Sequence, residues 1–142
     1  MLAMLGTGLP EKIDGEEDIV RFLMQSNHYN THCVRPVAFL PSPITNESSV
    51  SRHGREPRRD LWALGDIAAG ERTLKGAGIF KASRVNSEGL RLDFDEPPPR
   101  HAAIRGWRLD EDPQVQKSKQ LGQAQVLASA AGPALLFDPA EA

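Results

Sequence analysis

The sequence has 142 residues, the length of one domain, and its apolar fraction of 39% and charged fraction of 25% are ordinary for a globular protein. Its net charge of −2 excludes a strong overall attraction to nucleic acid or to an anionic membrane, and its single cysteine excludes an internal disulfide and a zinc site built on several thiolates. No stretch has the about twenty apolar residues of a membrane-spanning helix, and the N-terminus lacks the basic start of a signal peptide, so we expect a soluble, cytoplasmic protein.

Composition divides the chain into three parts. We expect residues 1–15 to form a flexible leader, residues 16–133 a single domain, and residues 134–142 a C-terminal tail that could dock or fray. Carboxylates at positions 16 to 18, followed by three apolar residues at helical spacing, predict a first helix over residues 16–26. The polar residues that follow, 26–33, predict a loop.

The next stretch has the character of two strands joined by a wide turn. Residues 36–40 are apolar and begin with a proline, which is tolerated at the first position of a strand. Val50, with serine on both sides, predicts a second and weaker strand that ends at Arg52 and His53. The turn between them contains Pro41, Pro43 and Asn46.

The second half of the sequence alternates between helix and strand patterns. A helix is predicted over residues 57–69, with proline at its first position and Gly70 as its stop. Residues 73–95 are strand-like, because apolar and charged side chains alternate toward their end. A further strand over residues 100–107 and a last helix over residues 114–131 complete the domain. The pattern predicts an α+β fold: a single domain with a small, mostly antiparallel sheet and two or three packed helices.

Five short segments of the sequence occur in the order found in a family of small bacterial proteins of unknown function. They are Arg35-Pro36-Val37-Ala38-Phe39-Leu40-Pro41, Ser49-Val50-Ser51-Arg52-His53, Leu61-Trp62-Ala63-Leu64-Gly65, Thr73-Leu74-Lys75-Gly76 and Arg100-His101-Ala102-Ala103-Ile104-Arg105-Gly106-Trp107. The chain resembles this family over about residues 19–131. It departs from the pattern where Pro57 and basic residues replace a helix-capping box, and where Arg100 and Arg108 replace asparagine and proline. The resemblance implies a single-domain fold and no particular activity.

Two Arg-His pairs, at positions 52–53 and 100–101, each lie near a predicted strand end. If the two strands are neighbours, His53 and His101 could act as general base and general acid of a metal-independent ribonuclease or phosphotransferase, with Arg105 as the phosphate clamp. The alternative is structural: each histidine satisfies backbone groups at a strand end.

A second candidate site is a group of basic residues near the start of the second helix. Its members are Arg52, Arg55, Arg58, Arg59 and Arg100. Phosphate or nucleic acid can bind where arginines converge on a helix N-terminus, but a surface helix also needs a polar outer side.

Metal and cofactor sites find little support in the sequence. His28, His32 and Cys33 lie in a polar segment that is a poor helix and that no third ligand of suitable spacing follows, so we expect a loop rather than a metal site. The chain has neither a phosphate-binding loop ending in Lys-Ser/Thr nor a nucleophile elbow, and we expect no cofactor.

Three functions remain open on this basis. The first is a non-enzymatic interaction or accessory module that acts with a larger bacterial protein partner, because no cofactor motif, metal set or clear nucleophile is present. The second is the two-histidine nuclease or phosphotransferase. The third is a nucleic-acid or anion-binding module that uses the basic cluster.

Overall fold

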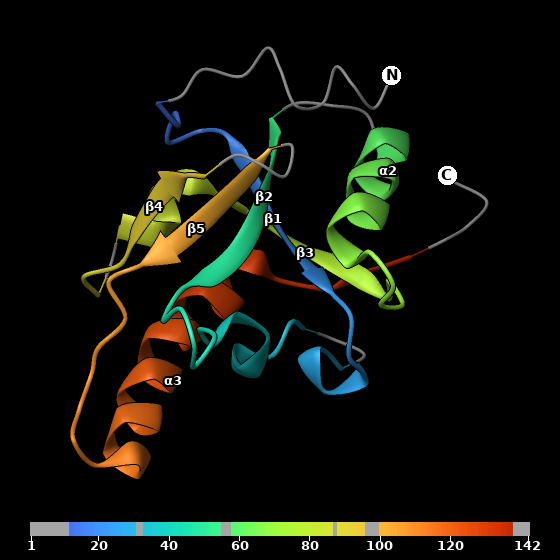
Figure 1. Ribbon diagram of the computed structural model, residues 1–142. Helices are drawn as coiled ribbons and strands as arrows, with labels where there is room; N and C mark the ends of the chain where they lie inside the picture. The colour runs from blue at the N-terminus through green and yellow to red at the C-terminus, as the bar shows by residue number, and fades with distance from the viewer. Residues whose placement is uncertain (1–11, 31–32, 55–57, 87, 96–99, 138–142) are drawn as a thin grey trace.

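The computed structural model describes residues 12–30, 33–54, 58–86, 88–95 and 100–137. Its centre is a six-stranded sheet in which every neighbouring pair is antiparallel, in the order β4-β5-β2-β1-β3-β6 (Figure 1). The strands are β1 (Asp18–Leu23), β2 (Ser48–Gly54), β3 (Gly76–Lys81), β4 (Arg91–Phe94), β5 (His101–Arg105) and β6 (Leu135–Leu136). The predicted α+β class with an antiparallel sheet is confirmed.

Helices cover both faces of this sheet. They are α2 (Arg58–Ala69), α3 (Pro113–Ala131) and the short 3₁₀ helices η1 (Ser26–His28), η2 (Pro36–Phe39) and η3 (Ala82–Asn86). One apolar core contains Trp107 and joins one sheet face to α3, η2 and η3, and a second contains Trp62 and joins the other face to α2 (Figure 1). Neither α2 nor α3 is long and apolar enough to cross a membrane, and the same holds for the rest of the described chain.

The predicted first helix over residues 16–26 is wrong, because this segment is the strand β1. It lies between β2 and β3, and alternate side chains enter opposite cores: Ile19 and Leu23 belong to the α3 side, Val20 and Phe22 to the α2 side. A strand buried on both faces shows apolar residues in consecutive pairs. In the sequence, these pairs imitate the i, i+3, i+4 spacing of a helix.

The strand predicted at residues 36–40 is also wrong. Proline stands at the first position of η2, where its fixed φ suits a helical turn and its missing N–H leaves no gap in a ladder. Ala38 and Phe39 are fully buried against the α3 side of the sheet. The apolar run therefore fills the core as a turn of helix, and β2 pairs with β1 and β5 instead.

The two long helices and the later strands are confirmed near their predicted positions. Gly70, predicted as a helix stop, follows α2, and Gly132 follows α3; their φ values are 59° and 64°, which glycine adopts without strain. The C-terminal segment docks in part, since β6 pairs with β3 and Phe137 packs edge-on against Trp62 at 5.1 Å between ring centroids.

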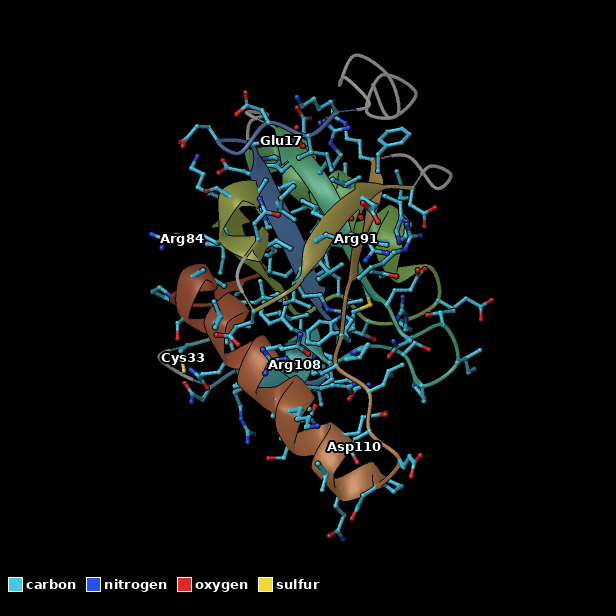
Figure 2. The ribbon with its side chains drawn as sticks, turned by 90° about the vertical axis from the view of Figure 1, so that its left-hand side faces the viewer. Glu17, Cys33, Arg84, Arg91, Arg108 and Asp110 are labelled. Atoms are coloured by element: carbon cyan, nitrogen blue, oxygen red, sulfur yellow. The ribbon has the colours of Figure 1, made fainter. Side chains whose placement is uncertain are left out.

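A buried ion pair connects Glu17, which immediately precedes β1, to Arg52 in β2. The guanidinium of Arg52, which has no solvent exposure, donates two hydrogen bonds of 2.7 Å to the Glu17 carboxylate and lies 5.6 Å from the ring centre of Phe94. Figure 2 shows Glu17 at the end of the sheet far from Asp110, which precedes α3. Because both charges are removed from water, their mutual attraction offsets part of the cost of burying them.

Substitution of one partner tests this dependence. We expect Glu17→Gln to lower the free energy of unfolding by about 3 kcal/mol, since it removes a carboxylate charge that compensates a buried guanidinium. Asp18→Asn removes a neighbouring carboxylate whose pair with Lys81 is exposed, and it should cost less than about 1 kcal/mol. Urea denaturation of both variants checks the difference, and equal costs would contradict the assigned role of the pair.

Gly106, which follows β5, has no room for a side chain. Its φ is 94°, and a Cβ at this position would collide with the backbone carbonyl oxygen of Gly89. Gly122 in α3 provides a contrast, because a Cβ there would meet no atom within 4 Å.

We expect Gly106→Ala to lower the free energy of unfolding by at least about 2 kcal/mol, because left-handed backbone strain and a clash with main chain add together. Gly122→Ala should instead raise it by about 0.5–1 kcal/mol through improved helix propensity. Thermal or urea denaturation measures both changes, and a neutral Gly106→Ala variant would refute the predicted close approach.

Candidate functional site

The pairing of β2 with β5 places the two predicted Arg-His segments side by side. Ser51 lies opposite His101 in the ladder, and the Arg52 amide donates to the Arg100 carbonyl at 2.7 Å. This bond makes Ser51 and His101 a pair of the non-hydrogen-bonded kind, in which the two Cα atoms are only about 4.5 Å apart. His53 is two residues beyond Ser51 on the same face, diagonal to His101, a spacing of about 7–8 Å.

His101 is held in one orientation by Asp95. Its Nδ1 lies 2.9 Å from the Asp95 carbonyl oxygen and 3.3 Å from a carboxylate oxygen of the same residue. A carbonyl can only accept, so Nδ1 carries the proton, and in the neutral ring the lone pair is on Nε2. Nε2 makes no hydrogen bond to any residue that the structure describes.

Arg105, predicted as a phosphate clamp, already has acidic partners. Its guanidinium donates to Glu47 at 2.7 Å and to Asp93 at 3.0 Å, and these bonds raise its pKa. An Asp95 carboxylate oxygen lies a further 3.8 Å from it. A substrate phosphate would therefore have to displace carboxylates in order to use Arg105.

Two members of the predicted basic cluster, Arg52 and Arg100, are buried. Arg52 is buried with Glu17, and Arg100 is 4% exposed and donates to the His53 carbonyl at 3.1 Å. Arg58 and Arg59 lie in the first turn of α2, where the structure describes the backbone, and Arg55 falls outside the described residues.

A cavity of about 270 Å³ lies between α2 and the half of the sheet face that α2 leaves open. One wall is apolar and consists of Phe22, Met24, Leu64, Ile67 and Ala68. The polar groups come from β1, β2, β5 and the segment after α2: Arg21, Ser49, Ser51, His101 and Arg72. The described lining of this cavity contains two arginines and no carboxylate. We refer to it as the two-arginine pocket.

Arg21 enters this pocket where the ladder between β1 and β2 stops. Residue pairs join the two strands from Asp18–Gly54 to Val20–Ser51. Beyond them, Arg21 donates from Nη1 to the Ser49 carbonyl at 2.7 Å and from Nε to the Ala38 carbonyl at 2.6 Å. The side chain thus satisfies a carbonyl that a continued ladder would have used. Its Nη2 amino group makes no hydrogen bond to the described residues.

Arg72 approaches the pocket from the C-terminal end of α2. It donates from Nη2 to the Ala68 carbonyl at 3.0 Å and from Nε to the Ala69 carbonyl at 3.3 Å. Free helix carbonyls suit a cation, so these contacts hold the guanidinium in place. Within the described part of the chain it forms no salt bridge, and its Nη1 has no hydrogen-bond partner.

Arg72 lowers the pKa of Arg21, and Arg21 lowers the pKa of a nearby histidine. Burial and the charge of Arg72 lower the pKa of Arg21 to about 10. Burial and the charge of Arg21 lower the pKa of His28 below 6.5, and the buried Nδ1 of His28 makes no hydrogen bond to the described residues. The backbone carbonyls that accept from Arg21 and Arg72 neutralise these two charges only in part. The pocket therefore keeps a positive potential.

A more polar hollow of about 480 Å³ adjoins this pocket and shares Arg21, Phe22, Met24 and Arg72 with it. His28 and Lys75 add further basic groups to its lining. Glu71 is its acidic lining residue, and forms no salt bridge with either arginine in the described structure. Across the described residues, histidine, cysteine, aspartate and glutamate form no group of three that could hold a metal ion.

No protein-family model, curated protein or solved structure matches this chain significantly. The resemblance to small bacterial proteins accordingly stays a prediction.

Sequence reasoning missed Arg21 and Arg72, the two residues that give the pocket its charge. Arg21 carried a signal, since it is the one charge within the apolar run from Ile19 to Leu23. A helix would have placed that charge in solvent, whereas a central strand buried on both faces has no outer side. Arg72 had no comparable signal, because an arginine after a helix stop is common at the surface.

The charge of Arg21 can be detected at His28. We expect Arg21→Gln to raise the pKa of His28, because the repulsion is removed, while burial keeps this pKa below 6.5. An NMR titration of the imidazole resonances measures the shift. Arg108→Gln removes an exposed guanidinium that is paired with Glu88, and it should leave the titration unchanged. Arg108 is labelled in Figure 2.

The lowered pKa of His28 also predicts that the stability of the fold depends on pH. The folded-state pKa is lowered, so the unfolded chain binds a proton at His28 first as the pH falls below 6.5. Stability contributed by neutral His28 is therefore fully present above pH 6.5 and declines under more acidic conditions. A wild-type protein whose His28 titrates above 6.5 would contradict both statements.

Proposed function

We propose that this protein binds a small organic anion in the two-arginine pocket. The observation that carries the proposal is the meeting of Arg21 and Arg72 in one cavity without a carboxylate partner among the described residues. Two like charges in a partly buried place are unfavourable unless something of opposite sign joins them. An anionic ligand would supply that charge.

The donor geometry suits a phosphate or carboxylate group. Each arginine uses one Nη group and Nε on protein carbonyls and leaves the other Nη group available, namely Nη2 of Arg21 and Nη1 of Arg72. Guanidinium N–H groups make charge-assisted hydrogen bonds to both kinds of oxyanion. Because protein carbonyls fix the arginines beforehand, little side-chain entropy remains to be lost on binding.

The rest of the pocket indicates what the anionic group is attached to. The apolar wall from α2 and β1 faces a side that carries Ser51 and His101. Small-molecule sites typically combine such an apolar wall with a few polar groups that fix orientation. We therefore expect a ligand with an apolar body and one anionic end, rather than a bare inorganic ion.

This proposal keeps the expected anion-binding function and moves it to other residues. The basic cluster from Arg52 to Arg59 is replaced by two arginines from β1 and the end of α2. A larger protein partner and nucleic-acid binding stay predictions, since the pocket argues for neither.

Binding of inorganic phosphate and of phenyl phosphate tests the proposal. We expect wild-type protein to bind phenyl phosphate more tightly than phosphate, because only the ester can also contact the apolar wall. Arg72→Gln should raise the Kd at least about tenfold, or 1.4 kcal/mol, by removing one charge from the pocket. Arg72 is the sharper target, since Arg21 also satisfies two backbone carbonyls. Calorimetry and ¹H–¹⁵N NMR titration measure both affinities.

Arg108→Gln is the matched control, because it makes the same change of charge at an exposed ion pair with Glu88. It should bind as wild type does, and Arg72→Lys should keep part of the affinity. If neither ligand binds to wild type, or if Arg108→Gln weakens binding as much as Arg72→Gln, the pocket is not an anion site.

A further inference from the structure

We propose that the two-arginine pocket hydrolyses phosphate esters, with His101 as the general base that activates water. This inference rests on the proposed anion site and extends it from binding to chemistry. It assigns His101 a catalytic role and Asp95 a positioning role, and it assigns Arg21 and Arg72 the task of holding the phosphoryl oxygens.

The first support is the fixed state of the imidazole. Nδ1 of His101 donates a hydrogen bond to the Asp95 carbonyl at 2.9 Å and lies 3.3 Å from a carboxylate oxygen of Asp95, so Nε2 is the basic nitrogen. The Asp95 carboxylate also favours the imidazolium that forms once Nε2 accepts a proton. Backbone geometry maintains the arrangement, because the Asp95 amide donates to the His101 carbonyl at 3.0 Å.

The second support is the position of the base. His101 lines the same cavity as both arginines, and its side chain is 18% exposed, so it is neither sealed in the core nor free in solvent. Ser51 lies directly opposite in the closer type of cross-strand pair and also lines the cavity. A base, a hydroxyl that can orient water, and two cationic donors thus line one pocket, as hydrolysis of an anionic ester requires.

The reaction balances without a further reactant. Water gives a proton to Nε2 of His101 as its oxygen forms a bond to phosphorus. The phosphorus–oxygen bond to the leaving group breaks on the opposite side of phosphorus; the departing alkoxide or phenoxide takes a proton from solvent water, and the imidazolium releases its proton to solvent. Arg21 and Arg72 stabilise the charge on the phosphoryl oxygens throughout. The products are an alcohol or phenol together with inorganic phosphate from a monoester or a phosphate monoester from a diester.

This arrangement differs from the predicted two-histidine mechanism in its clamp and in its number of histidines. Arg105 is occupied by Glu47 and Asp93, whereas Arg21 and Arg72 each keep an available amino group. His53 is not among the residues that line the pocket. One oriented histidine therefore serves as the base, and no second histidine is assigned as the acid.

The test measures turnover of 4-nitrophenyl phosphate and bis(4-nitrophenyl) phosphate by full-length protein, alongside phenyl phosphate binding. We expect His101→Gln to lower kcat at least about 100-fold, the usual contribution of a general base, while the Kd for phenyl phosphate changes less than threefold. Arg108→Gln should keep wild-type values of both, and circular dichroism verifies that each variant is folded.

Asp95→Asn separates a positioning role from a structural one. The carbonyl acceptor stays and the carboxylate charge is lost, so kcat should fall about tenfold while the Kd for phenyl phosphate changes less than threefold. A loss of rate through misfolding would weaken phenyl phosphate binding as well.

The outcomes distinguish this inference from the anion site itself. Binding without turnover of either ester, or turnover that survives His101→Gln, overturns the catalytic inference and leaves the anion site standing. An Asp95→Asn variant that keeps the wild-type kcat, or that loses kcat and phenyl phosphate affinity together, overturns the positioning role. Absence of phenyl phosphate binding in wild type overturns the anion site and the catalysis that rests on it.

Discussion

The early end of the ladder between β1 and β2 is the constraint on which the rest of the site depends. If β1 and β2 were paired along their whole length, there would be no opening beside Ser49. If the strands separated without a replacement donor, carbonyl groups at the strand edge would stay unsatisfied, which is unfavourable. Arg21 resolves the conflict by donating to the Ser49 carbonyl itself. The guanidinium of Arg21 therefore lies between β1 and β2 because the backbone needs its hydrogen bond. Arg72 lies close enough for its charge to lower the pKa of Arg21.

The elements with one wet side were predictable, whereas the strand that is buried on both faces was not. In α2 and β4, polar and apolar residues recur with the period of the element. β1 is buried on both sides, and its paired apolar residues fit a helix equally well. Burial of both faces removes the polar half of the pattern, and with it the information that separates the two periods.

The site shows the same division. Adjacent Arg-His pairs made His101 visible in the sequence, and the pairing of β2 with β5 does place it beside Ser51. The partners of each arginine could not be read in advance, because Glu47, Asp93 and Glu17 come from segments distant in the chain. Long-range ion pairs decide which cations are compensated. A charge count along the sequence therefore pointed to Arg52 and Arg105, both of which have acidic partners, rather than to Arg21 and Arg72.

The two tryptophans lie in separate cores, Trp107 on the α3 side of the sheet and Trp62 on the α2 side, where it also touches Phe137. Intrinsic tryptophan fluorescence therefore combines the emission of one indole from each core. Replacing either indole by phenylalanine leaves a single emitter that reports on one layer alone. Loosening of the α2 side of the sheet could then be followed in time separately from loosening of the α3 side.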